Sequence, residues 1–106
     1  MGDGGFAMMS QELETSRRAG APVVAVVLVD GSLSLIRIGQ ENRGLPNHGV
    51  DFGPLDSVLT ARAAGVEGVR VESAADLTAA VRDAFAAGRT TVIEVRVDPD
   101  SYRGLV

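Results

Sequence analysis

Two aspartates that neighbour glycines are the residues of this 106-residue chain whose types and positions suggest chemistry. Asp3 lies in a glycine-rich run at residues 2–5, and Asp30 begins the turn 30–32 that follows an apolar run. Ligands of an open parallel sheet bind beyond the carboxyl ends of its strands, so both carboxylates are expected at one such edge. Carboxylates bind hard divalent cations, and the amides of a glycine-rich turn suit a phosphate. The pattern indicates a cation that bridges the two aspartates to a diphosphate.

The same two aspartates also have a purely structural explanation. Aspartate and glycine dominate turns, so spacing alone favours two ordinary turns by about three to one. His48 is the only histidine, and because no carboxylate partner is identifiable it is expected in a solvated loop, not as an acid or base. The absence of cysteine excludes a thiolate metal site, a cysteine nucleophile and a disulfide scaffold.

Hydrophobic periodicity predicts the elements that position these residues. Strands are expected at residues 23–29, 66–72 and 90–97, and helices at residues 8–19, 33–40, 54–64 and 73–87. Ser10 is the expected N-cap of the first helix, and an apolar stripe from Leu77 to Phe85 marks the last. Strands that alternate with helices predict an α/β fold with a three-stranded parallel sheet, in a single domain over residues 1–106.

The first predicted strand carries most of the apolar signal. Residues 23–29 are apolar without alternation and rich in β-branched side chains, which predicts a strand buried on both faces. A sheet edge that lacks a neighbouring strand is open to pairing with other chains. We therefore expect the chain to self-associate.

Composition excludes several functional classes. The formal net charge of −4 argues against a nucleic-acid partner, because nucleic-acid binders present a basic face. The apolar run at 23–29 is too short to span a bilayer, and the N-terminus lacks the pattern of a signal peptide. No nucleic-acid or membrane partner is expected, and a cytoplasmic location is the expectation that remains.

The residues around the two aspartates carry a family resemblance. The segments 2–6, 11–15, 21–24 and 28–31 together resemble the thiamine-diphosphate signature, a Gly-Asp-Gly motif followed at this spacing by a pair of Asn or Asp residues. Residues 49–56 and 68–71 resemble the C-terminal domain of acetolactate-synthase-like enzymes. The resemblance extends from residue 2 to about residue 98 and implies a truncated pyrophosphate-binding domain of the thiamine-diphosphate-binding fold.

The resemblance implies a role for each matching residue. Asp3 and Asp30 match the two side-chain ligands of Mg²⁺, and Ser32 matches the position whose main-chain carbonyl completes the metal site. The positions that match the turns beside the diphosphate of the cofactor are Gly4, Gly5 and Gly31.

The chain departs from the family pattern in two ways. Val29 stands where the family usually has Asn. The strand before Gly-Asp-Gly and the pyrimidine-binding domain, whose glutamate activates the cofactor, are missing. The resemblance therefore leaves the enzyme class (lyase or transferase) open and implies the cofactor-binding part of a 2-keto acid decarboxylating or carboligating enzyme, inactive alone. A homo-oligomer or a partner chain that carries the pyrimidine-binding domain is expected; the alternatives are a non-catalytic interaction module and an unrelated phosphate-binding domain.

Overall fold

The centre of the molecule is a sheet of three parallel strands in the order β1-β3-β2. A computed structural model describes residues 1–53 and 55–105. The strands are β1 (Val24–Val29), β2 (Glu67–Val71) and β3 (Thr91–Arg96). The parallel α/β fold expected from the sequence is confirmed.

The last strand in the chain, not the first, is the most buried. Residues 91–94 of β3 are all buried, because β3 lies between β1 and β2 and helices cover both faces of the sheet. In β1 only Val27 is fully buried, and the other five residues are half-buried. The prediction that this strand is buried on both faces is therefore wrong, because β1 lies at an edge of the sheet. Its apolar character reflects packing on both faces: Ala25, Val27 and Val29 join the apolar cluster on one face, and Val24 and Val26 pack on the cluster on the other.

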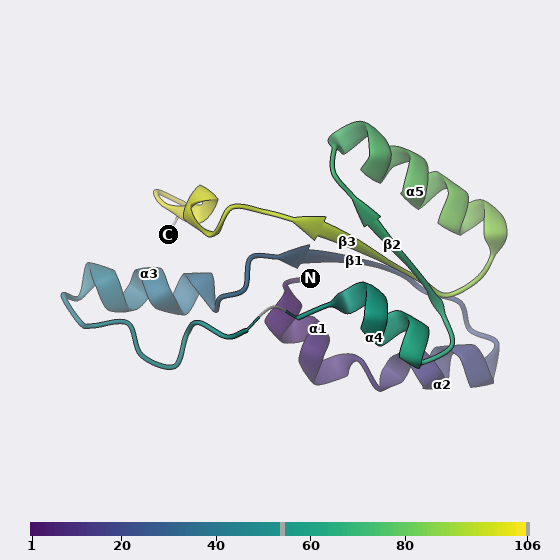
Figure 1. Ribbon diagram of the computed structural model, residues 1–106, viewed down its shortest axis with the longest axis horizontal. Coiled ribbons are helices and arrows are strands. Elements are labelled where there is room, and N and C mark those ends of the chain that lie inside the picture. Colours follow the sequence, from purple (N-terminus) through teal and green to yellow (C-terminus); the bar gives the residue numbers. More distant parts are fainter. Residues whose placement is uncertain (54, 106) are drawn as a thin grey trace.

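Helices cover both faces of the sheet, and one helix extends beyond it (Figure 1). The helices are α1 (Asp3–Met9), α2 (Glu12–Ala19), α3 (Ser34–Asn42), α4 (Ser57–Ala63), α5 (Ala74–Ala87) and the 3₁₀ turn η1 (Pro99–Tyr102). In Figure 1, α1, α2 and α4 lie on one face, α5 lies on the other, and α3 lies past the carboxyl ends of the strands beside η1. No helix among residues 1–53 and 55–105 has the length and apolarity needed to cross a membrane.

Two apolar clusters fill the two faces of the sheet. Under α1, α2 and α4 the buried members are Phe6, Leu13, Val27, Ala61 and Val92. Under α5 they are Val71, Ala84 and Ile93. Because adjacent residues of a strand point to opposite faces, β3 contributes to both clusters and holds the two helical layers together.

The N-terminal segment differs from its prediction. The glycine-rich run is not an open turn, because helix α1 begins at Asp3 and includes Gly4 and Gly5. The expected helix 8–19 is therefore two helices, and Ser10 is the C-cap of α1 instead of the N-cap of α2. The reason is that Gly2 is extended and pairs with Leu28 of β1, so the chain enters the helix immediately afterwards and buries Phe6.

The two later helices follow the sequence more closely. Helix α5 is capped by Ser73, which accepts the amide of Asp76 as expected, but Phe85 is 71% exposed and lies outside the buried face. Phe85 is at the margin of the predicted stripe, where the helix surface has already turned away from the sheet. Helix α4 begins at Ser57, three residues after the predicted start, and residue 54 lies outside the described residues.

Candidate functional site

The segments that carry the two aspartates are joined at the carboxyl edge of the sheet. Asp3 is buried, and its Oδ1 and Oδ2 accept the amides of Gly4 at 2.8 Å and Gly31 at 2.9 Å. The second bond joins the start of α1 to the turn that follows β1. The alignment of these segments comes from Gly2, which forms a parallel bridge with Leu28.

Asp30 organises the turn between β1 and α3. Its Oδ1 accepts the amide of Ser32 at 3.0 Å, and its Oδ2 accepts the hydroxyl of Ser34 at 2.7 Å. Gly31 has a φ of 73°, a left-handed conformation that favours glycine. This conformation directs the Gly31 amide toward Asp3, so the turn 30–32 and the start of α1 form one unit.

Ser32 presents its main chain, and not its side chain, to the site. The Ser32 hydroxyl donates to the carbonyl of Val50 at 3.2 Å, and Ser32 forms an isolated antiparallel bridge with Asp51. The side chain is buried in this contact. The Ser32 hydroxyl is therefore engaged elsewhere, and a metal-binding role for the Ser32 carbonyl stays a prediction.

A second loop, residues 50–53, borders the site, and its role was missed at the sequence level. The Val50 carbonyl also accepts the amide of Leu33 at 2.7 Å, and the Phe52 amide donates to the carbonyl of Gly31 at 3.2 Å. The Phe52 ring lies beside Gly4, where an added Cβ would be 3.8 Å from its Cζ. The signal in the sequence was the pair of apolar residues 50 and 52 between glycines.

The C-terminal turn lies near the two carboxylates. Burial raises the pKa of Tyr102, and the negative charges of Asp30 and Asp3 raise that pKa further. Ion pairs attach the turn to α3: Arg37 lies 3.1 Å from Asp100, and Arg103 lies 2.7 Å from Glu41. No hydrophobic period predicts the position of this tail, so that position is a finding of the structure.

The described residues offer no other cation site rich in side-chain ligands. Among them, no group of three or more His, Cys, Asp or Glu side chains is placed to hold a metal. His48 is exposed, and its backbone is bound on both sides by the side chain of Gln40, at 3.1 Å in each case. This agrees with a solvated loop histidine.

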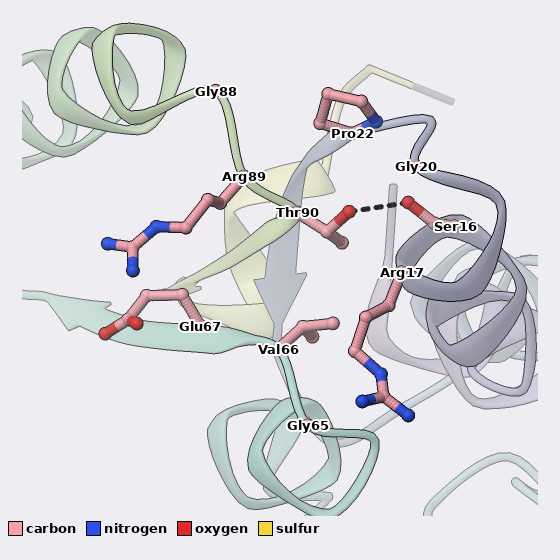
Figure 2. A pocket seen from close by; sticks show the side chains of 10 residues that line it. All are labelled: Ser16, Arg17, Gly20, Pro22, Gly65, Val66, Glu67, Gly88, Arg89 and Thr90. Carbon is pink, nitrogen blue, oxygen red and sulfur yellow. Dashed lines mark hydrogen bonds between the residues drawn. The ribbon is translucent and has the colours of Figure 1, made fainter.

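A pocket of about 360 Å³ lies at the opposite, amino edge of the sheet (Figure 2). Figure 2 shows Arg17 and Arg89 on opposite sides of this pocket, with the Ser16 and Thr90 hydroxyls 2.5 Å apart between them. Both arginines lie near helix C-termini, where a cation offsets the partial negative charge of the helix end. These residues are explained by helix stability and do not belong to the aspartate site.

This chain is similar in sequence to one family of known proteins. Residues 1–95 match the family described as "Thiamine pyrophosphate enzyme, C-terminal TPP binding domain". Acetolactate synthase of Bacillus subtilis (strain 168) is 37% identical over 97 residues, which cover 92% of this chain and 17% of the relative. The catabolic acetolactate synthase of Raoultella terrigena is 36% identical over the same shares of both chains.

Solved structures with a similar fold include decarboxylases. Benzoylformate decarboxylase from Polynucleobacter necessarius superposes with a TM-score of 0.87 and 29% identity, over 93% of this chain and 19% of that one. The chain thus spans less than a fifth of the length of these proteins. Its sheet, its helices and its sequence over residues 1–95 place it in one family. The chain belongs to the thiamine pyrophosphate enzymes, as their C-terminal TPP-binding domain.

Proposed function

We propose that this chain holds the diphosphate of thiamine diphosphate through Mg²⁺, as part of an acetolactate-synthase-like enzyme that acts on 2-keto acids. Asp3 and Asp30 supply side-chain ligands, and Ser32 supplies its main-chain carbonyl. Gly4, Gly5 and Gly31 line the path of the diphosphate. The observation that carries the proposal is the junction of the two aspartate segments through the bond from the Gly31 amide to Asp3.

The charge of the site supports a bound cation. Asp3 is only 3% exposed, and within residues 1–53 and 55–105 neither Asp3 nor Asp30 forms an ion pair with a basic side chain. Their hydrogen-bond donors are neutral amides and a hydroxyl. A buried carboxylate is costly unless its charge is balanced, and a divalent cation balances two.

The donor set also fits Mg²⁺. Each carboxylate oxygen of Asp3 and Asp30 accepts one hydrogen bond and keeps a further lone pair for a metal ion. Mg²⁺ prefers oxygen ligands and retains several waters or phosphate oxygens, so two carboxylates and one carbonyl are sufficient protein ligands. A Cβ added at Gly5 would meet no atom within 4 Å, which leaves open space beside α1 for a diphosphate.

These residues define what the protein contributes beside the cofactor. Thiamine diphosphate, when bound, supplies the carbanion chemistry, and the protein supplies binding and orientation. This chain holds and orients the diphosphate end. It does not turn over substrate alone, because no residue of it corresponds to the glutamate of the pyrimidine-binding domain. A partner chain brings that domain to the carboxyl edge of the sheet.

Calorimetry tests the metal and diphosphate part of the proposal. Thiamine diphosphate is expected to bind the chain in the presence of Mg²⁺ and to lose affinity when the metal is omitted. Asp3→Ala and Asp30→Ala are expected to abolish this metal dependence, whereas Asp83→Ala, on the exposed side of α5, leaves it unchanged. Equal binding by all four proteins would contradict the assignment of the site.

Co-expression tests the need for a partner. The chain alone is expected to release no CO₂ from pyruvate or benzoylformate. Co-expression with a pyrimidine-binding domain from a homologous enzyme is expected to restore release, and Asp3→Ala is expected to remove it again. Release of CO₂ by the isolated chain would contradict the proposal. A complex that forms without any turnover would favour a non-catalytic interaction module.

A further inference from the structure

A carboxylate that the proposed function does not use lies in the middle of the sheet. Glu94 of β3 is 1% exposed, and it faces α4 together with Arg70 of β2. Its Oε1 accepts from Nε of Arg70 at 2.6 Å, and its Oε2 accepts the amide and the hydroxyl of Ser57 at 3.1 and 2.7 Å. Three neighbouring donors therefore fix one buried carboxylate.

The same network fixes the start of α4. Nη2 of Arg70 donates to Oδ2 of Asp56 at 3.1 Å, and Oδ1 of Asp56 caps the helix by accepting the amide of Leu59 at 2.8 Å. The start of α4 is thus connected to Glu94 in two ways: Ser57 bonds Glu94 directly, and Asp56 is connected to it through Arg70. Replacing a buried ion pair by apolar residues is often neutral for stability, so such a pair is better explained by the geometry that it imposes.

That geometry reaches the aspartate site through loop 50–53. The loop precedes α4 by three residues in the chain, and its own hydrogen bonds run to the turn 30–32: Phe52 donates to Gly31, while Val50 accepts from Ser32 and Leu33. The loop is thus hydrogen-bonded to the turn 30–32, and it is followed closely in the chain by Asp56, the cap of α4 that Arg70 binds.

We infer that Glu94 is a positioning residue for the aspartate site, acting through the first turn of α4 and loop 50–53. The inference rests on the proposed function, because the site that it positions is the proposed Mg²⁺ and diphosphate site. Loss of the Glu94 charge releases the start of α4, and the loop and the turn 30–32 then sample more conformations. The affinity for Mg²⁺ and thiamine diphosphate falls although Asp3 and Asp30 are intact.

The test compares Glu94→Gln with a destabilised control. Ala84→Gly weakens α5 on the opposite face of the sheet and touches neither loop. At a temperature where both variants are folded, Glu94→Gln is expected to bind thiamine diphosphate with Mg²⁺ roughly tenfold more weakly than wild type, as losses of supporting residues around metal sites do. Ala84→Gly is expected to bind like wild type. Should Glu94→Gln not fold, Ser57→Ala removes only the hydroxyl bond to Glu94 and replaces it in the comparison.

A second readout does not depend on the ligand. In ¹H–¹⁵N spectra, the amide resonances of Gly31 and Phe52 are expected to move in Glu94→Gln and to stay in place in Ala84→Gly. Equal affinities in Glu94→Gln and wild type, with both resonances unmoved, would overturn the inference. If wild type itself does not bind, the proposed function fails, and the resonances alone decide whether Glu94 positions the loops.

Discussion

The backbone amide of Gly31 donates a hydrogen bond of 2.9 Å to Oδ2 of Asp3, twenty-eight positions earlier in the chain. This bond joins the two glycine-rich segments that the sequence separates by two helices and a strand. It requires Gly31 to adopt a φ of 73° and Asp3 to begin a helix next to β1. The consequences of this bond can be measured.

Gly31→Ala is expected to destabilise the fold by about 1–2 kcal/mol, because a side chain is strained in the left-handed region. Urea unfolding measures this loss. The matched control is Gly39→Ala within α3, where an added Cβ meets no atom within 4 Å. This control is expected to gain about 0.5–1 kcal/mol from the better helix propensity of alanine. Equal effects at the two glycines would show that the turn 30–32 tolerates a side chain.

Asp30→Asn and Asp30→Ala are expected to differ in metal binding. Asparagine keeps one oxygen for a hard cation, and alanine keeps none. We expect Asp30→Asn to retain a thermal shift with Mg²⁺ and thiamine diphosphate, reduced relative to wild type, and Asp30→Ala to show none. Differential scanning fluorimetry measures these shifts. A full shift in Asp30→Ala would mean that Asp30 is not a ligand.

Asp30→Asn is also expected to lower the pKa of Tyr102. Burial raises this pKa first, and the charges of Asp30 and Asp3 add to it, so removal of one charge brings the pKa part of the way back to its ordinary value. Tyr102 is the only tyrosine and the chain has no tryptophan, so phenolate absorbance reports this group alone. Asp83→Asn, on α5, is the control. An unchanged pKa in Asp30→Asn would separate the C-terminal turn from the aspartate site.

Glu94 is expected to make folding stability depend on acidity. Burial acts to raise the pKa of Glu94, but hydrogen bonds from Arg70 and Ser57 outweigh it and hold the pKa below the ordinary glutamate value. Its contribution to stability is therefore complete above that ordinary value and is lost as the pH falls through the folded-state pKa. The urea midpoints of wild type and Glu94→Gln are expected to differ most above the ordinary glutamate pKa and to converge as the pH falls below it. A constant difference across this range would contradict the assignment.

Self-association stays a prediction of the sequence, with a structural basis in β1. Of the described residues only Met1 and Gly2 lie along the outer edge of β1, where they bond to Val26 and Leu28. Val23, just before the strand, is 50% exposed. Light scattering is expected to show oligomers that grow with concentration, and Val23→Lys is expected to reduce them, because charges on an edge oppose strand pairing. A monomer at all concentrations would contradict this expectation.

Local signals predicted most of the fold. The αL glycines at 20 and 88 end α2 and α5 as expected, and the Ser73 cap starts α5, because these signals act within one turn of helix. Hydrophobicity did not predict that β3 is more buried than β1, because this difference follows from the order of the strands in the sheet. The split between α1 and α2 was missed for a similar reason, since the Gly2 to Leu28 pairing is a tertiary contact.

Some residues of the candidate site were likewise predictable from the sequence, and others were not. Asp3, Gly31 and Asp30 were identified from residue type and spacing, and the structure brings their segments together. Loop 50–53 and Tyr102 were missed because they approach the site only through folding, from positions about twenty and seventy residues beyond Asp30 in the chain. Nothing in the sequence predicted a role for Glu94, because its partners Arg70 and Ser57 lie on other elements and approach it only in the folded chain.

The order β1-β3-β2 also constrains the synthesis of the protein. Among the described residues, every strand pair of the sheet includes β3, which is translated after both β1 and β2. Until residues 91–96 have emerged, β1 and β2 have no neighbouring strand, and a nascent chain that stalls before residue 91 leaves the apolar strand β1 and the amphipathic strand β2 without that partner. Such exposed strands are targets for chaperones and for aggregation, so the yield of this domain depends on how quickly residues 91–96 follow β1 and β2 out of the ribosome.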